Sequence, residues 1–124
     1  MMQPELKRAF ELGIIDEKRL IELYELDDGS KSFALSLVED FMLQRETYFL
    51  SFELCLNNGD VAALGREAHK LKSSLANIAA SRAARCCANI EEKVKVGAPI
   101  QTLKLLVEDL KLEVSDFTVA CQQL

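Results

Sequence analysis

Residues 61–80, VAALGREAHKLKSSLANIAA, decide the fold of this 124-residue chain. Successive residues of a helix are turned by about 100°, and at that spacing the apolar side chains of the stretch gather into one arc. The arc consists of Val61, Leu64, Ala68, Leu71, Leu75 and Ile78. Asp60 precedes it and can accept a hydrogen bond from a free N–H group at the start of a helix. We therefore predict a helix from about Val61 to Ala80 with one face buried.

Two short helices are predicted ahead of a long one in the N-terminal half. Pro4 suits the first turn of a helix, and Asp16 can cap a second helix that ends at Asp27-Asp28-Gly29. A long helix then begins at Ser30 or Ser32, and its apolar side chains form one continuous stripe. The stripe contains Phe33, Leu37, Phe41, Tyr48, Phe52 and Cys55.

A second apolar row follows the same long helix at seven-residue spacing and consists of Leu35, Met42 and Phe49. We expect the two short N-terminal helices to cover this row, since large exposed apolar patches are uncommon on monomeric proteins. The alternative is that the row is a docking surface for a partner.

The turns that follow divide the rest of the chain. The long helix stops at Asn57-Asn58-Gly59, a strong helix-ending sequence. A break near Ser81 separates the helix of residues 61–80 from a fifth helix, which ends at Val96-Gly97, and Pro99 starts a sixth. Four long helices joined by such short turns must lie antiparallel to their neighbours. The predicted fold class is all-α: an up-and-down antiparallel four-helix bundle, capped by the two short N-terminal helices, in a single domain over residues 1–124.

Composition narrows the class of protein. The formal net charge is −5 with acidic and basic residues interleaved, which argues against a nucleic-acid partner, because phosphate binding needs a concentrated basic face. No apolar run approaches the ~20 residues of a membrane span, and no signal-peptide pattern opens the chain. Cys55, Cys86, Cys87 and Cys121 show no C-x-x-C spacing, so we expect buried, reduced thiols. These features predict a cytoplasmic protein that binds neither nucleic acid nor membranes.

The only histidine, His69, lies about a third of a turn from the centre of the apolar arc, so the helix should hold it outside the core. Small or positively charged residues lie near it on the same side of the helix, together with one serine. They are Ala62, Gly65, Arg66, Lys72, Ser73 and Ala76. Small neighbours allow another protein surface to approach the imidazole, and the two cations suit an anion better than a metal ion.

A neutral imidazole is a nucleophile near pH 7 and can attack a phosphoryl group. Lys72, one turn from His69, can supply positive charge to the phosphoryl oxygens, and Ser73 a hydrogen bond. No carboxylate lies one turn from His69 on this face, since Glu67 points elsewhere, so we expect a phosphohistidine here to resist hydrolysis. The alternatives are a core histidine with satisfied hydrogen bonds and an incidental surface histidine.

The segment from Ala68 to Ala80 resembles the signature of histidine phosphotransfer (HPt) domains. The matching residues are His69, Leu71, Lys72, Ser74, Ile78 and Ala80. The resemblance covers most of the chain. Residues 13–28 resemble the lead-in helices, residues 58–60 the turn before the histidine helix, and residues 87–97 the C-x-x-[IL]-E-E…G helix that follows.

The resemblance implies a stand-alone phosphorelay intermediate, a phosphohistidine carrier rather than an autonomous enzyme, with no kinase activity of its own. Such a protein takes a phosphoryl group from a receiver-domain aspartate onto His69 and passes it to another receiver aspartate. Its partners are receiver domains of hybrid histidine kinases and response regulators. The receiver binds Mg²⁺, so we expect no cofactor and no metal in this chain, which we expect to be a monomer. Lys72 would stabilise the transferring charge, and the residues expected to dock a receiver are Gly65, Arg66, Ser73 and Ala76.

Two positions depart from the family pattern. Ser73 and Ala79 stand where the family usually has glycine. Ser73 borders the His69 side of the helix and its side chain intrudes where a receiver would pack, so we expect altered partner choice or rate rather than loss of function. Ala79 falls at the edge of the core, and we expect it to matter only for helix packing.

The main alternative function is a helical adaptor that binds receiver domains or other proteins without carrying phosphate. A kinase is excluded, because the chain has neither a Gly-rich phosphate loop nor a nucleotide-binding pattern. A di-iron bundle needs two Glu-x-x-His pairs, which a chain with one histidine cannot supply.

Overall fold

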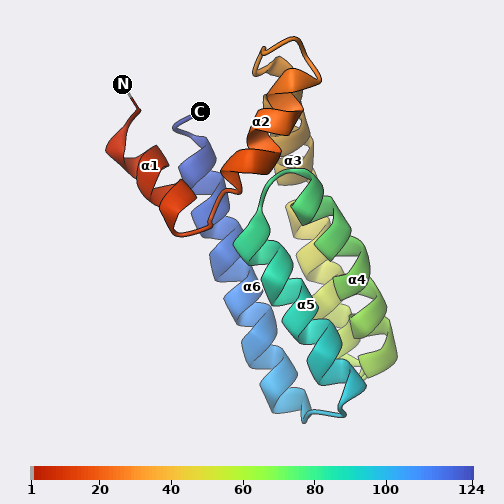
Figure 1. The fold of residues 1–124 in the computed structure, drawn as a ribbon. Coiled ribbons are helices and arrows are strands. Elements are labelled where there is room, and N and C mark those ends of the chain that lie inside the picture. Colours follow the sequence, from red (N-terminus) through yellow and green to blue (C-terminus); the bar gives the residue numbers. More distant parts are fainter. Residues whose placement is uncertain (1) are drawn as a thin grey trace.

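The computed structural model describes residues 2–124, and every regular element in that range is a helix. The helices are, in chain order, α1 (Pro4–Glu11), α2 (Glu17–Glu25), α3 (Ser32–Asn57), α4 (Val61–Asn77), α5 (Ser81–Lys95) and α6 (Ile100–Cys121). The last four run side by side as a bundle, and α1 and α2 lie at one end of it (Figure 1). The predicted all-α bundle of four helices with two short N-terminal helices is confirmed.

Each bundle helix packs against two others. α3 contacts α4 and α6, and α5 likewise contacts α4 and α6, so the four helices form a closed ring. The turns between consecutive helices of the bundle contain three or four residues, which leaves each bundle helix antiparallel to the next. The contact between α4 and α5 is the most extensive in the bundle. Side chains of these two helices therefore meet along a shared outer surface.

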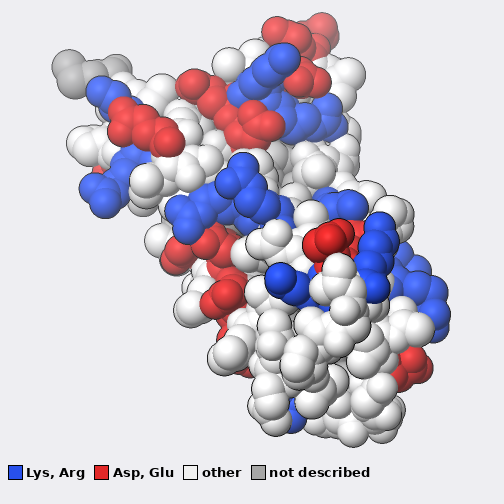
Figure 2. Space-filling model, turned by 60° about the horizontal axis from the view of Figure 1, so that its bottom comes forward, with Lys and Arg blue, Asp and Glu red and all other residues white. Residues whose placement is uncertain are grey.

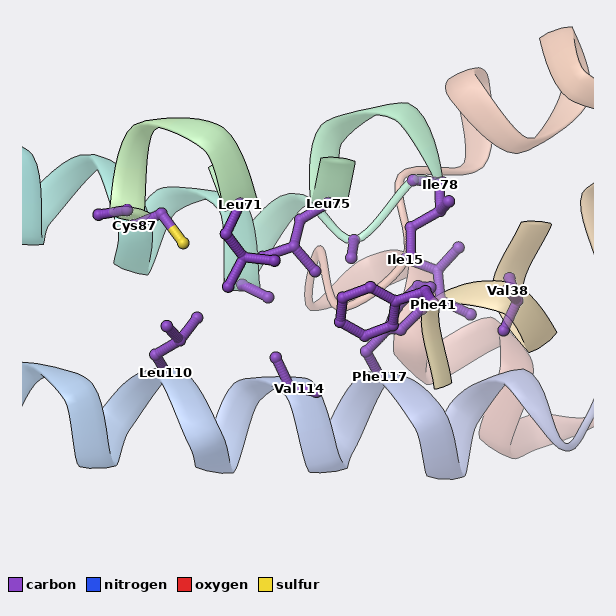
Figure 3. Close-up of a cluster of buried hydrophobic side chains, with 14 of the residues drawn as sticks. Ile15, Val38, Phe41, Leu71, Leu75, Ile78, Cys87, Leu110, Val114 and Phe117 are labelled. Atoms are coloured by element: carbon purple, nitrogen blue, oxygen red, sulfur yellow. The ribbon is translucent and has the colours of Figure 1, made fainter. Parts of the chain in front are cut away.

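The apolar arc of α4 faces the middle of the bundle, as predicted. Its fully buried members are Leu64, Ala68, Leu71 and Leu75. In Figure 3, Leu71 points across the core toward Leu110 and Val114 of α6. Complete burial of a leucine side chain contributes about 2 kcal/mol. The arc therefore fixes the rotation of α4, and with it the direction of the residues on the outer face of that helix.

The predicted cap forms at the start of α4. The carboxylate of Asp60 accepts a hydrogen bond from the backbone N–H of Ala63 at 3.1 Å. Gly59 precedes the cap with φ +66°, a left-handed conformation that glycine adopts without strain, so the chain turns sharply from α3 into α4.

The other end of α4 differs from the prediction. The helix stops at Asn77, three residues earlier than expected. Ala79 has φ +69°, and the N–H groups of Ala79 and Ala80 bond back to the carbonyls of Ala76 and Leu75 at 3.2 and 2.9 Å. This pair of bonds is a Schellman motif, the left-handed helix ending in which glycine is the usual residue.

The prediction that Ala79 matters only for helix packing is therefore wrong. The left-handed conformation costs an L-residue roughly 1–2 kcal/mol, which explains why the family usually has glycine at this position. Ala79 is 1 % exposed, and its carbonyl accepts a hydrogen bond from the N–H of Asp16 at 2.8 Å. Arg19 of α2 adds hydrogen bonds to the carbonyl and side chain of Asn77 at 3.1 and 2.7 Å. The end of the histidine helix is thus joined to the start of α2.

The second apolar row of α3 is not fully covered. α1 packs against α6, and α2 packs against α3. Met42 and Phe49 are half-buried, but Leu35 is 37 % exposed. The expectation that the two N-terminal helices cover the row is therefore wrong for Leu35, because α1 lies against another helix.

The cysteines are free thiols. Cys87 and Cys121 are buried as predicted, whereas Cys55 and Cys86 are only half-buried. Burial raises the pKa of both buried thiols to about 12, so they stay protonated at neutral pH.

Within residues 2–124, no helix combines the length and the apolar character needed to cross a membrane.

Candidate functional site

His69 stands on the outer face of α4, near the middle of the helix. Its side chain is 64 % exposed, whereas the preceding residue, Ala68, is completely buried. The outward orientation predicted from the apolar arc is confirmed. A histidine packed inside the core is therefore excluded, and another molecule can reach the ring.

A carboxylate from α5 contacts His69. Glu91 Oε2 lies 2.9 Å from His69 Nδ1, and Glu91 Oε1 lies 2.6 Å from Lys72 Nζ. The Glu91 side chain is only 15 % exposed. One carboxylate thus bridges the imidazole and the ammonium group that α4 places one turn apart.

The bridging position keeps Glu91 ionised. Removal from water by itself raises the pKa of its carboxyl group. Hydrogen bonds from Lys72 and His69, together with the charges of these groups, outweigh that effect and hold the pKa below its ordinary value. The carboxyl group is therefore a carboxylate at neutral pH.

The charge of Glu91 determines the tautomer of His69. A carboxylate can only accept hydrogen bonds, so His69 Nδ1 must donate in this contact, and we assign the Nδ1–H tautomer on this basis. In the neutral ring, the lone pair is then on Nε2. The arrangement therefore presents a nucleophilic nitrogen on an exposed ring.

Glu91 is not among the site residues predicted from the sequence, because helical periodicity could locate a carboxylate beside His69 only on the histidine helix itself. A helical wheel gives directions within one helix, but it does not show which face of α5 turns toward α4. The Glu-Glu pair in the segment that resembles C-x-x-[IL]-E-E was the available signal. The structure separates its two members: Glu91 faces α4, whereas Glu92 is exposed and has no ion-pair partner in the described part of the chain.

A groove of about 410 Å³ lies between α4 and α5 beside His69. The residues that line it are Ala62, Gly65, Arg66, His69, Lys70, Glu91, Val94 and Lys95. Of the residues predicted to dock a receiver, Gly65 and Arg66 line this groove. Ser73 and Ala76 are exposed further along α4 and are not part of its lining.

Positive charge is concentrated in one stretch of the chain. Residues 61–95, which hold α4 and α5, contain seven Lys and Arg residues and three Glu residues, a net charge of +4. The whole chain carries −5, so the remaining residues together carry −9. In Figure 2, blue side chains surround a red group in the middle of the view, and the end of the molecule nearest the viewer is nearly free of charge. The groove beside His69 is lined by three of these cations, Arg66, Lys70 and Lys95, and by one carboxylate, Glu91, so it is a positively charged region of an acidic protein.

Among residues 2–124, no three His, Cys, Asp or Glu side chains lie close enough to hold one metal ion.

Comparisons with known proteins agree with this geometry. The family model of the Hpt domain matches residues 36–117. The crystal structure of histidine-containing phosphotransfer protein B (HptB) from Pseudomonas aeruginosa PAO1 is similar to this one with a TM-score of 0.75 and 26 % sequence identity, over 88 % of this chain and 92 % of that chain. A comparison with curated proteins gives no match. The chain therefore belongs to the Hpt family, whose members transfer phosphoryl groups through a histidine in phosphorelays with receiver domains.

Proposed function

We propose that this chain is a phosphorelay intermediate in which His69 accepts a phosphoryl group from a receiver-domain aspartate and passes it to an aspartate of another receiver. The observation that carries the proposal is the hydrogen bond from His69 Nδ1 to Glu91 on the exposed face of an Hpt bundle. This bond leaves the Nε2 lone pair free, which a phosphoryl acceptor requires.

In the forward step, the Nε2 lone pair attacks the phosphorus atom of an aspartyl phosphate. The N–P bond forms, the P–O bond to the aspartate breaks, and the aspartate leaves as a carboxylate. The ring keeps its hydrogen on Nδ1 and becomes positively charged, next to the Glu91 carboxylate at 2.9 Å. No proton has to move, and the reverse sequence delivers the group to the second receiver.

Lys72 is the residue that we propose to stabilise the transferring group. Phosphoryl transfer depends mainly on positioning and on positive charge near the equatorial oxygens. Lys72 lies one turn from His69, and Glu91 holds its ammonium group at 2.6 Å. The Lys72 side chain is 35 % exposed, so it keeps access to an incoming anion. Ser73, exposed at the next position, can donate a hydrogen bond to the same group.

We propose that receivers dock on the face formed by Gly65, Arg66, Ser73 and Ala76, none of which is buried. The partners are receiver domains of hybrid histidine kinases and response regulators, which bring Mg²⁺ to the reaction, and this chain acts as a monomer. The free thiols fit a reducing compartment and support our proposal of a cytoplasmic location.

Transfer from phosphorylated receivers tests the proposed function. The wild type and His69→Gln are incubated with a panel of purified, radiolabelled receiver domains, and acid-labile label on each protein is followed with time. We expect label on the wild type alone, and its passage to a second receiver when that receiver is added. A wild type that binds receivers but takes up no label would instead establish the helical adaptor.

A further inference from the structure

Building on the proposed function, we propose that the groove between α4 and α5 receives one apolar side chain of the docking receiver. We further propose that Arg66 and Lys95 on the rim of the groove contact carboxylates around that side chain. The inference concerns how the partner is held, at a place beside the reacting atoms.

Apolar residues form the walls of the groove toward the start of α4. Ala62 and Gly65 on α4 lie across from Val94 on α5, and the volume of about 410 Å³ is within the range of pockets that hold small organic groups. The turn that follows α5, residues 96–99, contains no charged residue, and Val96 is 64 % exposed. An apolar side chain seated here would remove these walls from water, which is favourable.

Gly65 lets α5 lie close against α4 beside the groove. A Cβ at this position would lie 3.1 Å from Val94 Cγ1, closer than ordinary van der Waals contact, so any larger residue would displace Val94 and change the wall of the groove. Glycine is also the least favourable helix-forming residue after proline. The shape of the groove beside Val94 therefore depends on glycine at position 65, at a cost to the helix.

The positive charges on the rim have no partners within the described chain. Arg66 and Lys95 are exposed, and neither has a carboxylate within 4.0 Å in residues 2–124, whereas Lys70 lies 3.5 Å from Glu67. With Arg66, Lys70 and Lys95 against the one carboxylate of Glu91 in its lining, this groove attracts an acidic surface and repels a basic one.

The position of the groove identifies its occupant. His69 itself lines the groove, so a receiver that brings an aspartyl phosphate to Nε2 also places the neighbouring part of its surface over the groove. A buried apolar anchor supplies most of the affinity in a typical interface, and charges on the rim mainly increase the association rate. An apolar side chain surrounded by carboxylates therefore fits this groove best.

Ala62→Glu tests the inference, with Asn89→Glu as the matched control. Ala62 is exposed in the first turn of α4, where a carboxylate is favourable to the helix, so the variant should fold. Asn89 is exposed on α5 but lines a separate groove, together with Arg82, Arg85 and Glu113. The probes are the receiver that transfers fastest to the wild type and phosphoramidate, a small phosphoryl donor that needs no docking.

We expect Ala62→Glu to raise the receiver KM by about tenfold or more, the effect of losing a buried anchor. Its kcat and its labelling by phosphoramidate should change by no more than about twofold, and Asn89→Glu should match the wild type in all three. In the wild-type complex, NOEs should join the Val94 methyl groups to an aliphatic or aromatic side chain of the receiver.

The groove inference alone would be overturned by an Ala62→Glu receiver KM equal to that of Asn89→Glu, or by a complex without NOEs from Val94. A fall in kcat at unchanged KM would also overturn it, since the groove would then act on His69 rather than on docking. A wild type that is labelled by phosphoramidate but by no receiver would overturn the proposed function and, with it, the inference.

Discussion

Replacing Glu91 by alanine should slow phosphorylation of His69 by receivers and by phosphoramidate alike. The variant removes the acceptor that lies 2.9 Å from His69 Nδ1. The ring, 64 % exposed, can then rotate and take either tautomer, and only one tautomer presents a lone pair at Nε2. The loss therefore acts on the nucleophile itself and does not depend on the phosphoryl donor.

The size of the effect follows from the geometry. A hydrogen bond to a charged group contributes about 1.5–3 kcal/mol, and the lower end applies here because water competes for the exposed ring of His69. About 1.5 kcal/mol corresponds to a rate factor of about ten. Glu91→Ala should therefore slow transfer about tenfold. Glu91→Gln keeps a neutral acceptor and should slow it about threefold.

The assay is the time course of phosphohistidine formation, followed by phosphorus NMR with phosphoramidate and by label transfer with a receiver. Glu92→Ala is the matched control, because it removes the same charge from the next, exposed position of α5. Thermal melts check that every variant is folded. Equal rates for the wild type and Glu91→Ala would refute the role of this carboxylate in holding the tautomer. Equal losses in Glu91→Ala and Glu92→Ala would assign the effect to net charge.

Four further changes have defined outcomes. Lys72→Ala should slow transfer from receivers roughly ten- to a thousandfold without loss of folding, because it removes the positive charge that we propose to stabilise the phosphoryl oxygens. Rapid-quench assays measure the transfer rate. Ser73→Leu should abolish receiver transfer while melting near the wild-type temperature, since Ser73 is exposed on the face where we propose that receivers dock. Persistent transfer would place the interface elsewhere. Ala79→Val should lower the free energy of unfolding, measured by urea melts, by about 2 kcal/mol or more, because a β-branched residue is strained at φ +69° in a buried site. In the same melts, the free energy of unfolding of Ala79→Gly should stay within about 1 kcal/mol of the wild type. The stability that Glu91 contributes should be present above the ordinary pKa of a glutamate and be lost as the pH falls through its lower folded pKa. Urea melts of the wild type and Glu91→Gln should therefore converge in acid.

The bundle and the position of His69 could be predicted from the sequence because both depend on periodicity within one helix. The apolar arc of α4 is strongly patterned, and burial of that arc leaves only one direction for His69. The end of the same helix could not be placed in this way. Ala79 adopts the left-handed conformation without being glycine, so the residue type gave no sign that the helix stops at Asn77.

Glu91 could not be found from periodicity, because its role depends on how α5 is rotated against α4. Gly65 allows the close approach of these helices beside Val94, and the packing of the core then turns one glutamate of a pair toward His69. A wheel of α5 shows that Glu91 and Glu92 point about 100° apart, but only the packed bundle shows which of them reaches the histidine helix.

The uneven distribution of charge has a consequence for encounters between copies of this chain. Two copies that approach through the grooves beside His69 bring Arg66, Lys70 and Lys95 of one copy against the same three cations of the other. At physiological salt this repulsion acts over about 8 Å, close to the distance at which surfaces begin to dock. An acidic partner meets attraction over the same distance. The charges proposed to favour an encounter with an acidic partner therefore also oppose an approach in which one copy covers the histidine of another.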